Sequence, residues 1–170
     1  MRIAILGMGD SLKEYHPDEY DFAIGVNDIW RYVKTKYVVC LDHRKVFTAD
    51  RISVIDDCKP VAFYSQIVNW DTRPDFVKID LLPGYPDNFC QLETKAFHKS
   101  FCSPFVACQI AYKYHKADEI HLFGVDMVNH PHLDIELCDK IKIHFKNLKT
   151  SLLDKNCPLI IHGEGILKDI

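Results

Sequence analysis

Residues 1–12 read MRIAILGMGDSL, and this stretch decides the fold that we expect for the chain. The apolar run IAIL is typical of a buried parallel strand, because both faces of such a strand are covered. Gly7 and Gly9 follow at once and allow a sharp turn or a close approach of the backbone to a ligand. Ser11 is placed to cap a helix whose free amide groups would suit a phosphate. The stretch therefore predicts a strand, a glycine turn and a helix N-terminus.

The glycine turn departs from the full dinucleotide-binding fingerprint. Leu12 stands where the third glycine would be, and no acidic residue for a ribose follows at the expected distance. Asp10 would also repel a phosphate. A tight turn between a strand and a helix, with no ligand, therefore stays open as an alternative for this motif.

Composition and charge favour one domain that does not bind nucleic acid. The chain has 170 residues, 48% of them hydrophobic, and no linker divides it, so we expect a single domain over residues 1–170. Lysines and arginines are scattered and the formal charge is −3, so the sequence has no basic stripe for DNA or RNA. No apolar run is long enough for a membrane span, and the first residues lack the layout of a signal peptide. We expect a cytoplasmic protein.

The seven cysteines are odd in number and irregularly spaced, and several stand in apolar runs. We expect buried free thiols. Because no C-x-x-C motif is present, the sequence supports neither a structural zinc site nor a redox pair.

Apolar runs and helical patterns alternate along most of the chain. Further strands are expected at residues 22–26, 37–41, 60–64, 119–123 and 159–161. Ser103 and Pro104 form a cap and a first helical residue for a helix that ends near Ala117, and apolar residues between 137 and 152 have helical spacing. Apart from the strand at 60–64, the segment 50–99 is predicted to be mostly turns and loops. This order predicts a three-layer, Rossmann-like α/β fold with a mostly parallel sheet and helices on both faces.

Polar residues follow several of the predicted strands. Asn27 follows the second, Asp42 the third, and Asp126 comes after the run at 119–123. In open α/β sheets, ligands bind beyond the carboxyl ends of the strands, so we expect these residues near a ligand. Two structural interpretations stay open, because asparagine is a good helix cap and an aspartate after a strand commonly holds its own loop.

Several of these motifs, taken in order, resemble a known family. They are Gly7-x-Gly9-x-Ser11-Leu12, Asn27, Ser103 and the run ADEIHLFGVD at residues 117–126. Together they resemble the bacterial sialyltransferases that use CMP-sialic acid. They are also similar to the Rossmann-like domains grouped with 6-hydroxymethylpterin diphosphokinase.

The resemblance implies roles for individual residues. By position, Gly7, Gly9, Ser11, Asn27 and Ser103 would bind or adjoin the nucleotide. The catalytic histidine of the sialyltransferases lies before their last long helix, so His130 or His132 would be its counterpart. A neutral imidazole there could take the proton from an acceptor hydroxyl as the hydroxyl attacks the sugar.

The sequence also departs from that family. Asp42 stands where a second nucleotide-binding asparagine is usual, and Val128 stands where a phosphate-binding tyrosine is expected. The lid after Gly124 is cut to about ten residues. Stabilising a leaving phosphate and excluding water would be harder without these parts, whereas nucleotide binding depends on them less.

No cofactor is required by this interpretation, although a divalent metal is one option. His130, His132 and Asp134 could form a metal site with His43 or His162, but nine histidines in 170 residues give close pairs by chance. A pterin diphosphokinase would need magnesium, for which the candidate ligands are Asp10, Asp42 and Asp126. A serine hydrolase is disfavoured because the chain has no G-x-S-x-G motif.

The leading hypothesis is a protein that binds a nucleotide or nucleotide sugar and acts as a small, sialyltransferase-like glycosyltransferase with a CMP-type donor. The alternative is a non-catalytic protein that sequesters or senses a phosphorylated small molecule. The candidate catalytic residues are His130 and His132. The candidate substrate-binding residues are Gly7, Gly9, Ser11, Asn27, Asp42, Ser103 and Asp126.

Overall fold

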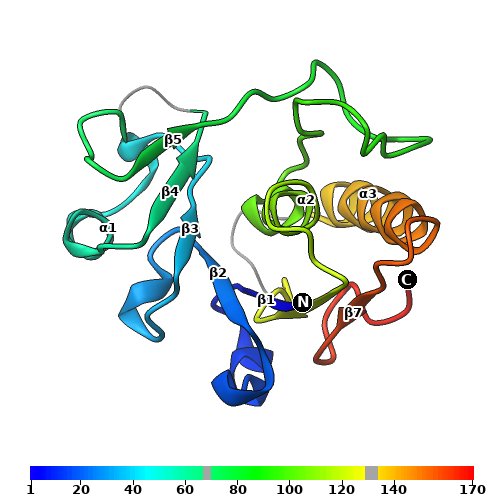
Figure 1. The fold of residues 1–170 in the computed structure, drawn as a ribbon, viewed down its shortest axis with the longest axis horizontal. Coiled ribbons are helices and arrows are strands. Elements are labelled where there is room, and N and C mark those ends of the chain that lie inside the picture. The colour runs from blue at the N-terminus through cyan, green and yellow to red at the C-terminus, as the bar shows by residue number, and fades with distance from the viewer. Residues whose placement is uncertain (67–69, 129–133) are drawn as a thin grey trace.

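The computed structural model describes residues 1–66, 70–128 and 134–170, and its centre is a seven-stranded sheet (Figure 1). The strand order is β5-β4-β3-β2-β1-β6-β7, and each neighbouring pair is parallel. The strands are β1 (Arg2–Leu6), β2 (Phe22–Val26), β3 (Tyr37–Val39), β4 (Ala62–Ser65), β5 (Phe76–Lys78), β6 (Glu119–Phe123) and β7 (Leu159–Ile161). The predicted parallel sheet is confirmed.

Helices cover both faces of this sheet, as the sequence predicts. One face packs against α2 (Ser103–Lys113) and α3 (Ile135–Leu153), whose buried side chains share a core with the inward residues of β1, β2 and β6. The other face packs against α1 (Ala49–Asp57) and a series of short 3₁₀ helices. In Figure 1, α2 and α3 lie together, whereas α1 lies at the far end of the sheet near β4 and β5. The architecture is three-layered and Rossmann-like.

Strand β1 lies inside the sheet, between β2 and β6, and its run IAIL is fully buried. From β1 the chain adds strands on one side, out to β5, and then crosses to the other side to form β6 and β7. The strand order thus reverses between β1 and β6. In open α/β sheets, ligands bind at the carboxyl ends of strands at such a reversal.

Part of the segment predicted as loops is ordered secondary structure. It contributes α1 and the edge strand β5. Arg73 joins these two elements, because its guanidinium donates to the carbonyl oxygens of Ile55 and Cys58 and pairs with Asp75. Trp70 is fully buried, and its indole N–H donates to the Asp42 carbonyl at 3.0 Å.

Three predicted helix caps are wrong. The helix expected from Ser11 is a five-residue 3₁₀ helix, η1 (Asp10–Glu14), capped by Gly9. Asn27 precedes another 3₁₀ helix, η3 (Ile29–Arg31), whose cap is Asp28. Helix α2 begins at Ser103 itself, and its N-cap is Cys102. Each polar side chain predicted as a cap instead has a partner far away in the sequence, as described below.

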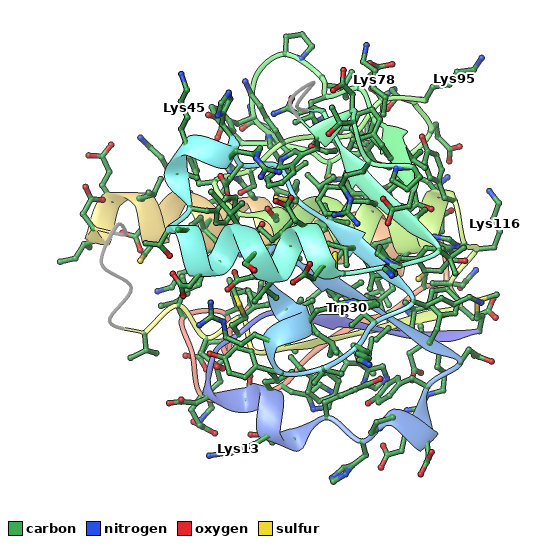
Figure 2. All side chains as sticks on the ribbon, turned by 90° about the vertical axis from the view of Figure 1, so that its left-hand side faces the viewer. Lys13, Trp30, Lys45, Lys78, Lys95 and Lys116 are labelled. Carbon is green, nitrogen blue, oxygen red and sulfur yellow. The ribbon has the colours of Figure 1, made fainter. Side chains whose placement is uncertain are left out.

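All seven cysteines are free thiols, and only Cys102 and Cys138 are partly exposed. Burial is the main cause that raises the thiol pKa of Cys58 and Cys157 to about 11, and of Cys90 and Cys102 to about 12. Among the residues that the structure describes, no helix is both long and apolar enough to cross a membrane. Labelled lysines project outward at separate places on the surface in Figure 2, namely Lys13, Lys45, Lys78, Lys95 and Lys116.

Candidate functional site

The turns that follow β1 and β6 are hydrogen-bonded to each other at the carboxyl edge of the sheet. The amide of Gly7 donates to the Phe123 carbonyl, and the amide of Gly9 donates to the Gly124 carbonyl, both at 2.8 Å. A Cβ on Gly7 would lie 2.3 Å from the Gly124 oxygen, and one on Gly124 would lie 2.4 Å from the Gly7 oxygen. The glycines therefore permit the backbones of the two turns to touch.

Ser11 and Asp126 strengthen this junction from inside. The Ser11 amide donates to Asp126 Oδ2 at 2.9 Å, and the Gly124 amide donates to Ser11 Oγ at 2.8 Å. Both residues are buried, with exposed fractions of 2% and 8%. Asp126 Oδ1 has no hydrogen-bond partner within the described part of the chain. Both side chains therefore hold the two turns together.

The loop after β7 completes this junction, and sequence reasoning missed its role. Gly163 has a φ of +91°, and a Cβ on it would lie 2.4 Å from the Cβ of Ser11 and 2.5 Å from Asp126 Oδ1. The amide of Ile166 donates to the Asp126 carbonyl at 3.0 Å. The run HGEG at 162–165, with two glycines directly after a strand, was the available signal.

Asn27 and Ser103 meet beside this junction. Asn27 directly follows β2 and has a φ of +52°, and its amide donates to the Val39 carbonyl at 3.0 Å. Ser103 Oγ lies 3.5 Å from Asn27 Oδ1, which is a long hydrogen bond. Cys102, the N-cap, makes no side-chain capping bond, and the Asp42 carboxylate lies close enough to this helix end to raise the pKa of the Cys102 thiol in addition to burial, which is the main cause. Asn27 and Ser103, which are both predicted to bind or adjoin a nucleotide, therefore lie side by side.

Asp42 lies at the end of β3 and keeps more than a third of its surface exposed. Partial removal of water raises the pKa of its carboxyl, and the nearby Arg51 guanidinium acts in the opposite direction. Arg51 is itself fixed by the buried Asp28, whose Oδ1 accepts from Nε at 2.9 Å and from Nη2 at 2.5 Å. The negative charge of Asp42 therefore has a cation nearby that sequence reasoning missed.

The two candidate catalytic histidines, His130 and His132, lie outside the described residues. Asp134, proposed above as one metal ligand, is the N-cap of α3 and accepts from the Leu137 amide at 2.8 Å. Within residues 1–66, 70–128 and 134–170, no group of three or more histidine, cysteine or acidic side chains is arranged to hold a metal ion. The metal option gains no support from the described geometry.

Comparisons with known proteins bear on the fold of this site. No family model matches the chain, and no curated protein matches it significantly. Among solved structures, the chain is similar to a mutant of alpha-2,3/8-sialyltransferase CstII, with a TM-score of 0.56 and 15% sequence identity. The likeness covers 95% of this chain and 81% of that one. At this identity it shows a shared fold, and nothing in it supports the resemblance to pterin diphosphokinase-like domains.

Proposed function

We propose that the chain binds a nucleotide or nucleotide sugar at the carboxyl edge of the sheet, above β1, β2 and β6. The observation that carries this proposal is the N-terminus of α2, which begins beside Asn27 near the reversal of strand order. A helix N-terminus without a side-chain cap attracts a phosphate through its backbone amides and its dipole. The amides of Gly7, Gly9 and Ser11 are engaged within the protein, so the phosphate is assigned to α2.

The reaction that we propose for this site is glycosyl transfer from a CMP-type donor. The acceptor hydroxyl oxygen forms a bond to the anomeric carbon, and the bond from that carbon to the phosphate oxygen breaks. CMP leaves with the electron pair, and the hydroxyl proton passes to a histidine base, for which His130 and His132 are the candidates. The fold shared with a sialyltransferase supports this choice of reaction.

Ligand binding is tested by isothermal titration and thermal shift with CMP, CMP-sialic acid and UDP- and GDP-sugars. A ligand that binds only the native state raises the apparent stability. We expect CMP or CMP-sialic acid to give the largest shift, and Ser103→Ala or Asn27→Ala to weaken binding about tenfold, as expected for one lost hydrogen bond. Thr94→Ala is the matched control, because the Thr94 hydroxyl donates to the Ala96 carbonyl and accepts from Lys113 Nζ, and it makes no contact with Asn27 or Ser103. Equal binding by all four proteins would contradict the assigned site.

Val128 favours a second candidate function, a non-catalytic protein that sequesters or senses a phosphorylated small molecule. Val128 is 58% exposed. It stands where the sialyltransferases that the chain resembles have a phosphate-binding tyrosine. Incubation with CMP-sialic acid and a glycoside acceptor separates the two functions. Release of CMP that disappears in His130→Ala or His132→Ala supports the transferase, and tight binding without product supports the sensor.

A further inference from the structure

A hydrogen-bonded chain of ionisable side chains runs across β1, β6 and β7 on the face opposite α2 and α3. Glu119 Oε1 contacts both Arg2 Nε, at 2.8 Å, and His121 Nε2, at 2.6 Å. His121 Nδ1 lies 2.8 Å from His162 Nε2. His121 is 5% exposed, whereas His162 is partly exposed. The chain thus leads from a surface carboxylate through a buried imidazole to a second imidazole.

The positions of the ring hydrogens follow from the contacts. A carboxylate only accepts hydrogen bonds, so His121 Nε2 carries the hydrogen that points to Glu119. The contact between the two imidazoles then needs one hydrogen between them. In the neutral pair it sits on His162 Nε2, and when the pair gains one proton it can sit on His121 Nδ1.

A second proton cannot be accommodated in this arrangement. If both imidazoles were charged, both facing nitrogens would carry hydrogens across 2.8 Å, and two positive charges would lie side by side. The rings are also stacked, with centroids 5.1 Å apart. Double protonation therefore requires the two rings to separate.

Other charged groups face this pair from each neighbouring element. Glu14 in η1 and Glu19 in η2 (Pro17–Glu19) favour a proton on His162. Arg2 Nη2 in β1 lies 3.4 Å from His121 Nε2, and the Tyr20 hydroxyl lies 3.3 Å from His121 Nδ1. Burial is the main cause that lowers the pKa of His162, and the imidazole of His121 is the second cause. Together they outweigh the two glutamates, which act in the opposite direction. Protonation of His162 is thus displaced to lower pH than in an open chain.

His162 is joined directly to the loop that packs on the junction of the two turns. Its backbone amide donates to the Leu122 carbonyl at 3.0 Å, and its ring stacks on Phe123 with centroids 4.0 Å apart. The next residue, Gly163, lies against Ser11 and Asp126. A displacement of His162 therefore moves the backbone that packs on the junction of the two turns.

We propose that Glu119, His121 and His162 form a pH-sensitive switch that keeps Gly163 packed on Ser11 and Asp126 only while the facing imidazole nitrogens share one hydrogen. Uptake of the second proton separates the rings and loosens the loop after β7. The switch does not depend on which ligand the site takes. It adds proton-controlled access to the carboxyl edge of the sheet.

The test is a pH titration of the ¹⁵N-labelled full-length chain by nuclear magnetic resonance from pH 8 to pH 5. Long-range correlations of the imidazole nitrogens report the protonation of His121 and His162, and backbone amides report the junction at Ser11, Gly124 and Gly163. We expect the amides to change with the midpoint of the second ring protonation. The protection factor of the Ser11 amide should fall at least about tenfold in the same range.

Two variants and a control decide the outcome. His162→Gln places an amide nitrogen near the position of Nε2 and cannot take the second proton, so the transition at Ser11 and Gly163 should vanish. Glu119→Gln removes the carboxylate beside His121 and should move the transition to lower pH. His115→Gln removes another partly buried histidine, which contacts Tyr64, and should leave the transition unchanged. Junction amides that stay constant down to pH 5, or a transition that persists in His162→Gln, would overturn the proposal.

Discussion

At the scale of single residues, the contact between Gly7 and Gly124 is one of the tight constraints on the carboxyl edge of the sheet. Gly7→Ala would place a methyl group 2.3 Å from a backbone oxygen that has no side-chain freedom to move away. We expect a loss of about 2–3 kcal/mol in the free energy of unfolding, which is typical of overpacking. Chemical denaturation of the variant measures this loss.

Gly84→Ala is a suitable control for this prediction. Gly84 has a φ of +78°, but a Cβ added there would meet no atom within 4 Å. Its substitution measures the backbone strain alone, for which we expect about 1 kcal/mol. A Gly7→Ala variant no less stable than Gly84→Ala would show that the two turns can separate without cost.

At the scale of elements, α3 depends on the cap supplied by Asp134. The Asp134 carboxylate accepts from the Leu137 amide at 2.8 Å. Asp134→Ala should cost about 1 kcal/mol of unfolding free energy, as is typical for loss of an N-cap. Asp139→Ala, an exposed position in the same helix, should have little effect. Equal stability of the two variants in urea would argue against this capping role.

The sequence predicts elements with a clear periodic pattern and misses those without one. The apolar residues of α3 have helical spacing, so the sequence predicts this helix, and those from Ile141 to Leu152 are buried. Helix α1 has one buried residue, Ile55, and therefore has no apolar stripe in its sequence. Strand β5 has only three residues and is not fully buried, so its apolar signal is too short. The local pattern of apolar residues therefore predicts most of the helices and strands in the three layers.

Roles in the site are harder to predict, because the partners are distant in the sequence. Ser11 and Asp126 look like a helix cap and a loop residue until folding brings them together across 115 positions. The glycine pattern predicts a sharp turn or a close approach of the backbone to a ligand, whereas the close approach that the structure shows is to the backbone of Gly124. The prediction that His130 and His132 are catalytic remains to be tested.

At the scale of the whole molecule, we expect stability to fall with acidity in two stages. Burial is the main cause that lowers the pKa of three histidines, namely His98, His115 and His162. The unfolded chain therefore binds more protons than the folded chain once the pH drops below about 7, and the free energy of unfolding decreases as the pH falls through about 6.5 and lower.

The second stage begins below about pH 4.5, where unfolded carboxylates take up protons that the folded ones resist. Hydrogen bonds to Thr48 and Arg31 lower the pKa of Asp50 to about 2. Hydrogen bonds with Arg44 and Lys155 lower the carboxyl pKa of Asp56 and Glu93, and hydrogen bonds with His121 and then Arg2 lower that of Glu119. Urea denaturation between pH 8 and pH 3 measures both stages, and constant stability from pH 7 to pH 5.5 would contradict the first.

The buried thiols also allow local opening of the folded chain to be measured. A cysteine reacts with an alkylating reagent as the thiolate, and the raised pKa values keep these thiols protonated while they are enclosed. Cys58 follows α1, Cys90 belongs to the core shared with α2 and α3, and Cys157 lies between α3 and β7. The labelling rate of each native cysteine therefore measures how frequently its own layer opens, and no cysteine has to be introduced.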